Sequence, residues 1–150
     1  MTVAWNKFNI LPQNLSQGVH NLATDTTKIM LTNTAPVATN ALKADITEIA
    51  AGNGYTAGGN ACSVTSDTQS GGVLKYILAN PATWTASGGT IGPFRYAVHY
   101  DDTPSSPLKP LIGWWDYGSA VTLNAGETFT VAADTSGDAW TSGAPLLTLA

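Results

Sequence analysis

The clearest pattern in the chain is an alternation of large apolar residues with polar or small residues over positions 94–100, FRYAVHY. Every second residue of this stretch is large and apolar, which is the period of a strand with one face packed inward. Residues 101–110 then hold two Asp, two Ser and three of the chain's eight Pro, which predicts a loop. We expect a second strand over residues 111–116 and a turn at Tyr117-Gly118, so that two neighbouring strands form the centre of a β-sheet.

Further apolar stretches separated by Gly, Asn and Pro predict additional short strands. Residues 73–79, VLKYILA, are apolar on both faces apart from Lys75, which favours a central position in the sheet. The other expected strands cover residues 28–33, 62–66, 84–85, 121–123, 128–132 and 146–149.

Two segments have the composition of short helices. Residues 13–20 follow Pro12, which is tolerated in a first helical turn, and lie within an apolar spacing of three to four. Residues 41–51 combine Ala, Leu, Lys and Glu with Asp45 as a potential cap. Residues 52–61 contain four glycines and are expected to be an extended surface loop.

Together these elements predict an all-β fold, mainly antiparallel, of the sandwich or jelly-roll type. One or two short helices are expected in the N-terminal third. The 150 residues suit a single domain over positions 1–150, with residues 1–26 as an N-terminal helix or arm.

Charged residues make up only 11% of the chain, against about 25% in typical soluble domains. Such a surface suits close packing against other proteins. The net charge of −4, with six Lys and Arg together, argues against nucleic-acid and anionic-membrane partners. No basic, apolar leader or stretch of eighteen apolar residues is present, so we expect synthesis in a cytoplasm.

Candidate catalytic and metal-binding groups are few. Cys62 is the only cysteine and alternates with apolar Val64, which favours packing over a nucleophilic role with His99. The glycines at 52–57 formally match a dinucleotide fingerprint, but the strand before and helix after are not expected there. Asp101, Asp102 and Asp116 lack a calcium-loop pattern. We therefore predict no enzyme activity, no cofactor and no metal.

The chain has five tryptophans. Trp84, Trp114, Trp115 and Trp140 could stack on sugars, or they could anchor the core and a protein interface. Trp114 and Trp115 are adjacent, so on a strand they point to opposite faces. In a chain so poor in charge, an outward tryptophan is more often covered by a neighbouring protein.

Three long blocks, KIMLTNTAPVATNALKADITEIAAGNGYTAGG, IGPFRYAVHYDDTPSSPLKPLIGWWDYG and NAGETFTV, resemble small virion structural proteins encoded by tailed bacteriophages. The resemblance covers roughly residues 15–132 and implies a component of the phage particle, with no catalytic residue. The N-terminal part departs from the pattern, because Pro12 stands where a longer helical segment precedes residues 19–22.

The leading hypothesis is a capsid decoration, or cement, protein that binds the outside of the mature head and is located in the virion. Its partner would be the major capsid protein or another virion protein, and it would form a homotrimer or another homo-oligomer. The expected interface anchors are Trp5, Phe8 and one of Trp114 or Trp115. The alternatives are a tail, collar or fibre component that binds a host surface, or a carbohydrate-binding module.

Overall fold

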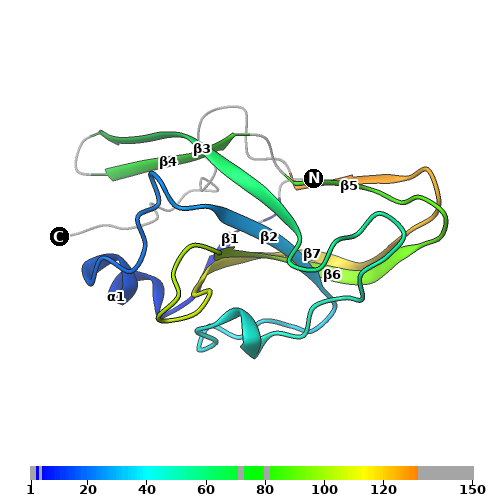
Figure 1. Ribbon diagram of the computed structural model, residues 1–150, viewed down its shortest axis with the longest axis horizontal. Helices are drawn as coiled ribbons and strands as arrows, with labels where there is room; N and C mark the ends of the chain where they lie inside the picture. Colours follow the sequence, from blue (N-terminus) through cyan, green and yellow to red (C-terminus); the bar gives the residue numbers. More distant parts are fainter. Residues whose placement is uncertain (1–2, 4, 71–72, 80–81, 132–150) are drawn as a thin grey trace.

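The computed structural model describes residues 3, 5–70, 73–79 and 82–131, and it is mostly antiparallel β-sheet, as predicted (Figure 1). A six-stranded sheet has the order β1-β7-β6-β2-β3-β4, and β5 and β8 form a second sheet. The strands are β1 (Trp5–Lys7), β2 (Thr27–Thr32), β3 (Asn60–Ser70), β4 (Val73–Ala79), β5 (Thr83–Thr85), β6 (Ile91–Asp101), β7 (Leu111–Leu123) and β8 (Thr128–Thr130). The helical elements are α1 (Leu11–Ser16) and the 3-10 helix η1 (Lys43–Asp45).

The predicted central strand is β6, and it lies between β2 and β7 in the large sheet. Its alternation places successive residues on opposite faces. Leu31 of β2, Ala97 of β6 and Trp115 of β7 are register neighbours on one face, which we call the first face. Met30, Val98 and Trp114 are register neighbours on the other, the second face. Both faces of this part of the sheet are therefore covered.

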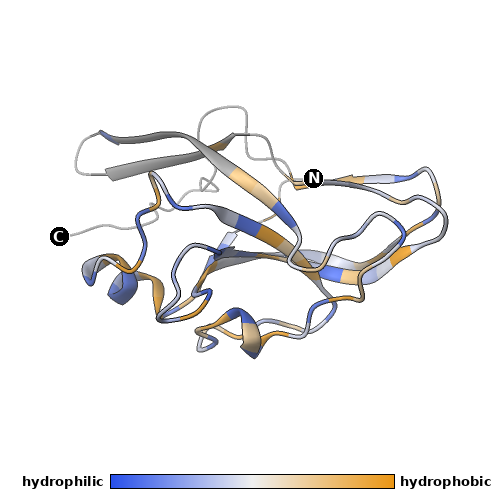
Figure 2. Ribbon diagram, viewed as in Figure 1, coloured by the Kyte–Doolittle hydropathy of each residue, from blue (hydrophilic) through white to orange (hydrophobic). Residues whose placement is uncertain are grey.

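Two separate apolar clusters lie on these faces. The first-face cluster includes Trp84 of β5, and Phe129 of β8 packs against it. The second-face cluster contains Phe8, Met30, Ile46, Val98, Tyr100 and Leu111. Figure 2 shows hydrophobic residues along β2 and along the segment that carries η1, which covers the second face.

The predicted turn at Tyr117-Gly118 does not end the strand, because β7 continues to Leu123. The register with β6 passes from Tyr96↔Asp116 to Phe94↔Val121, so residues 117–120 have no partner on β6. Gly118 has a φ of +94°, and its N–H donates to Asp116 Oδ1 at 2.8 Å. The turn-forming residues thus make a bulge of four residues inside one long strand.

Both predicted helices are shorter than expected. The first runs from Leu11 to Ser16, with Pro12 in its first turn, and does not reach His20. The second prediction, over residues 41–51, was wrong except for η1. This segment crosses the end of β2, where the Ile49 N–H donates to the Leu31 carbonyl at 3.1 Å. Tertiary hydrogen bonds therefore override its helix-forming composition.

Among the described strands, residues 73–79 do not take the central position that was predicted for them. β4 lies at the end of the strand order, and β3 is the strand that pairs with it in the described part of the chain. The β3–β4 hairpin is drawn at the upper left of Figure 1. The strand predicted at 146–149 lies outside the described residues.

Candidate interaction surface

Three of the predicted interface residues meet where β1 pairs with β7. Trp5 is the register partner of Trp115, Asn6 of Trp114, and Lys7 of Gly113. A Cβ atom at Gly113 would lie 2.1 Å from the Trp5 indole, so only glycine lets this ring lie against the β7 backbone. Trp5, Trp114 and Trp115 are each partly exposed. We call these three residues the tryptophan edge.

Trp114 and Trp115 point to opposite faces, as their adjacency predicts. Trp114 packs on Phe8 on the second face, with ring centroids 4.4 Å apart. Trp115 packs against the first-face cluster, and its ring lies 6.3 Å from His99. The tryptophan edge therefore presents aromatic surface on both sides of one sheet edge.

Phe8 requires a correction as a surface anchor, because its side chain is 0% exposed. Its N–H donates to the Ile112 carbonyl at 3.3 Å, which keeps the chain beside β7 as it leaves β1. Phe8 therefore belongs to the core and supports Trp114 from beneath. No sequence signal distinguished it from Trp5, since both are isolated aromatics in the first eight residues.

The sugar-stacking arrangement of four tryptophans is not formed by the three that the structure describes. Trp84 is 1% exposed and lies near Tyr55 and Phe129, with ring centroids 6.2 and 6.3 Å away. Trp114 and Trp115 face opposite ways. Trp140 lies outside the described residues.

An ion pair borders the tryptophan edge on β6 and β7. Arg95 binds Asp116 through two hydrogen bonds, Nε to Oδ1 at 2.7 Å and Nη2 to Oδ2 at 2.8 Å. The guanidinium holds the pKa of Asp116 below its ordinary value. It also lies 5.3 Å from the Tyr96 ring centroid. The two charges neutralise each other, so this border adds little net charge.

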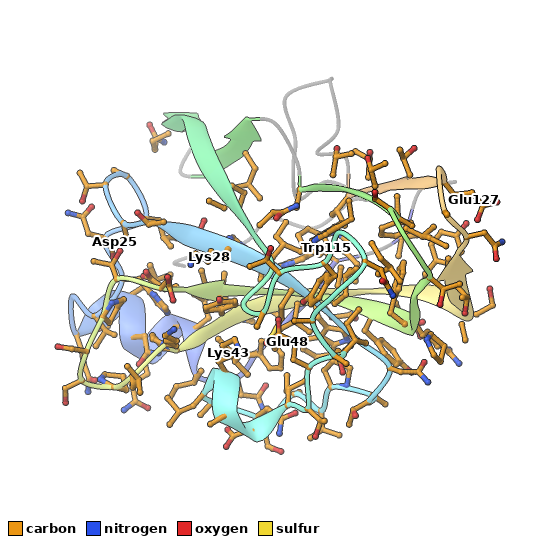
Figure 3. The ribbon with its side chains drawn as sticks, turned by 45° about the vertical axis from the view of Figure 1, so that its right-hand side comes forward. Asp25, Lys28, Lys43, Glu48, Trp115 and Glu127 are labelled. Carbon is orange, nitrogen blue, oxygen red and sulfur yellow. The ribbon has the colours of Figure 1, made fainter. Side chains whose placement is uncertain are left out.

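The Glu48 carboxylate binds several groups beside residues 30–32 of β2, the part of that strand that does not pair with β3. Glu48 accepts a hydrogen bond from Lys43 Nζ at 2.7 Å (Figure 3). It also accepts hydrogen bonds from the Tyr55 hydroxyl at 2.6 Å and the Gly58 N–H at 2.5 Å. Burial acts to raise the pKa of Glu48, but these three donors outweigh it and lower the pKa. The Tyr55 hydroxyl in turn accepts the Leu31 N–H at 3.0 Å.

Buried titratable groups gather at the start of β2 and the end of β6. His20 Nδ1 lies 2.9 Å from Asp101 Oδ2, and both side chains are fully buried. Asp25 also interacts with Asp101, and burial is the largest influence raising the Asp25 pKa. Burial lowers the pKa of His99 to about 3, so this ring is neutral at pH 7.

Cys62 is part of the packed core. Its Sγ lies 3.1 Å from Thr27 Oγ1, and burial raises the pKa of the thiol to about 11. A thiol with this pKa is protonated at pH 7 and is a poor nucleophile. The predicted packing role is therefore confirmed.

The three aspartates considered for a cation bind separate partners. Asp101 binds His20, Asp116 binds Arg95, and Asp102 binds Lys28 at 2.7 Å and Lys109 at 2.9 Å. Within the described ranges, no group of three or more His, Cys, Asp or Glu side chains is placed to hold a metal ion.

The glycine-rich segment after residue 51 packs as a loop. Gly54 has a φ of +99°, and a Cβ atom there would lie 2.1 Å from the Thr85 carbonyl oxygen. Gly52 and Tyr55 exchange backbone hydrogen bonds of 2.8 and 2.9 Å. These glycines allow a tight turn against β5, and they do not link a strand to a helix as a dinucleotide site requires.

Comparison with protein-family models, with curated proteins and with solved structures finds no match. Among the described residues, no helix has the length and apolar character needed to span a membrane.

Proposed function

We propose that this chain is a structural protein of a tailed-bacteriophage virion and that it decorates the outer surface of the mature head. The observation that carries the proposal is the tryptophan edge, where Trp5, Trp114 and Trp115 are partly exposed around a three-residue edge strand. Large aromatic side chains at a surface with few charges are typical of protein interfaces.

The mechanism of such a protein is physical. A protein that binds only the assembled lattice stabilises that lattice by mass action. Copies that bridge neighbouring capsid subunits gain further strength from multivalency. The interface anchors would be the tryptophan edge, with Phe8 holding Trp114 in place from the core.

The composition supports this role in preference to catalysis. The charged share is 11%, Glu48, Asp102 and Asp116 bind lysine or arginine side chains, and the cysteine is buried. A surface of hydroxyls, amides and backbone allows close approach of other subunits without strong repulsion.

The test is electron cryo-microscopy of the particle that carries this chain, combined with a binding assay on heads from which the chain has been removed. Density repeated over the head lattice and saturable rebinding are expected. Trp114→Ala should weaken rebinding by at least about 30-fold, as for an interface anchor worth about 2 kcal/mol. Val37→Ala, which changes an exposed residue on another loop, should leave it unchanged.

Density confined to the tail or to one vertex would contradict the decoration role and favour a tail, collar or fibre component. Quenching of tryptophan fluorescence by sugars, without binding to heads, would favour a carbohydrate-binding module.

A further inference from the structure

Among the described strands, β4 is the last strand at one side of the large sheet. It runs for seven residues, Val73–Ala79, and six of these are apolar. Within the described part of the chain, its ladder partner is β3, which carries Ser66, Asp67 and Thr68 opposite Ile77, Tyr76 and Lys75. About half of the backbone N–H and C=O groups of an edge strand face away from its partner.

The opposite edge of the same sheet is protected from such pairing. β1 has only three residues, and its last residue is the exposed Lys7. Beyond β1, the bulge at residues 117–120 interrupts the regular edge of β7. A short strand, a lysine and a bulge are the usual devices that keep a sheet edge from adding another strand. Of these three devices, β4 has only a lysine, Lys75.

We propose that β4 is a self-association surface, on which β4 of a second copy of this chain adds in antiparallel orientation. The strand is self-complementary when the two copies are centred on Tyr76. Leu74 of one copy then lies opposite Leu78 of the other, and Lys75 opposite Ile77. Such pairing is isologous and extends each sheet across a two-fold axis.

Repulsion between the two copies of Lys75 favours the register centred on Tyr76 over the one centred on Lys75. If the strands were centred on Lys75, the two lysines would lie directly opposite each other, which destabilises a sheet. Centring on Tyr76 separates the two lysines along the strand and places each of them opposite an isoleucine in the register. The hairpin also carries Asp67, so Lys75 and Asp67 balance and two hairpins approach without a net charge between them.

The small size of the β4 surface predicts weak self-association. A standard stable interface uses about 20–30 residues a side, several times the seven of β4. We therefore expect a dissociation constant in the micromolar range, about 10–100 µM, for the chain alone. This self-association goes beyond the proposed function, and it can be measured without any head, so failure of either proposal leaves the other standing.

The test is sedimentation equilibrium of the full chain from about 5 to 500 µM, with tryptophan fluorescence to verify folding. The wild type should pass from monomer to dimer. Ile77→Lys creates two Lys–Lys oppositions across the axis and should raise the dissociation constant by about 100-fold or more. The control Thr128→Lys, which adds the same charge to an exposed strand residue of β8, should change it less than about threefold.

A charge exchange separates loss of the interface from loss of the fold. Lys75→Glu combined with Ile77→Lys places a glutamate opposite a lysine in the proposed register, and dimerisation should return. A wild type that stays monomeric at 500 µM, whether because the chain's own C-terminal residues cover β4 or for another reason, would overturn the proposal. So would an Ile77→Lys variant that dimerises as the wild type does, or a folded double variant that stays monomeric.

Discussion

The two faces of the central sheet are covered in different ways. The first-face cluster contains fifteen buried apolar residues among those described, including Trp84 of β5, and Phe129 of β8 packs against it. The second face carries six, and its cover includes residues 33–51, whose regular structure is limited to η1. The second cover depends on hydrogen bonds to Glu48 and to the end of β2, because irregular chain must satisfy its backbone groups individually.

Because of this difference, we expect the two faces to lose different amounts of stability when a buried side chain is truncated. A cover made of strands in register resists collapse around a cavity. An irregular segment can shift to fill one, which lowers the cost of a lost side chain.

The largest expected effect comes from removing one fully buried aromatic on each face. Trp84→Ala on the first face should lower the free energy of unfolding by about 5 kcal/mol, and Phe8→Ala on the second by about 3 kcal/mol. Urea titration of both variants measures the difference. Equal losses would show that the irregular cover is as rigid as the β5–β8 sheet.

Trp84→Phe serves as the control for the first face. Trp84 Nε1 is buried without a hydrogen-bond partner among the described atoms. Removing this N–H offsets part of the lost packing, so we expect a cost below about 1.5 kcal/mol.

The next effect concerns two carboxylates, Asp101, which is fully buried, and Glu48, which is partly exposed. Asp101→Asn removes the charge beside His20, where both side chains are 0% exposed, and should cost about 2–3 kcal/mol. Glu48→Gln should cost about 1–2 kcal/mol, because Glu48 is 13% exposed and water can replace part of the lost interaction. Thermal or urea unfolding at pH 7 checks both. A larger loss of stability for Glu48→Gln than for Asp101→Asn would indicate that the cover of the second face depends more strongly on its carboxylate.

The smallest expected effect, when it is taken for one unit of pH, is the pH dependence from His99. Its ordinary pKa is 6.5 and its folded pKa about 3, so between these values the unfolded chain binds a proton that the folded chain does not. Stability must therefore fall as the pH falls through this window, by at most about 1.4 kcal/mol per pH unit. The folded carboxyl pKa values of Asp45, Glu48, Asp102 and Asp116 are lowered, so these groups add to the loss at more acidic pH.

His99→Leu isolates this contribution. Unfolding measured in urea at about pH 6.5, 5.8 and 5 should show a shallower slope for the variant than for the wild type, whatever its absolute stability. The raised pKa of Asp25 acts in the opposite sense, since the folded state then holds its proton more tightly. An unchanged slope would assign the proton uptake to other groups.

Much of the fold follows from patterns within single segments. The alternation at 94–100 predicted β6, the Pro-rich stretch predicted the loop before β7, and the adjacency of Trp114 and Trp115 predicted their opposite faces. The buried position of Cys62 followed from its alternation with Val64. Each of these depends on backbone geometry that repeats every two residues, so a local pattern is sufficient.

The candidate surface was predictable only in part. Trp5, Trp114 and Trp115 are large aromatics in strands, but Phe8 carries the same local signal and is buried. The difference arises because Phe8 passes beneath Trp114 after β1 has paired with β7, a contact between residues more than a hundred positions apart.

The sequence alone determined the alternating strands, the loops between them and the shortage of charge, because these depend on neighbours along the chain. Tertiary structure alone decided that β4 comes last among the described strands of its sheet, that residues 41–51 remain mostly non-helical and that a bulge replaces the turn at Gly118. Strand order and long-range hydrogen bonds depend on which distant segments meet. An apolar strand has the same pattern whether a neighbouring strand of its own chain or a second copy covers it.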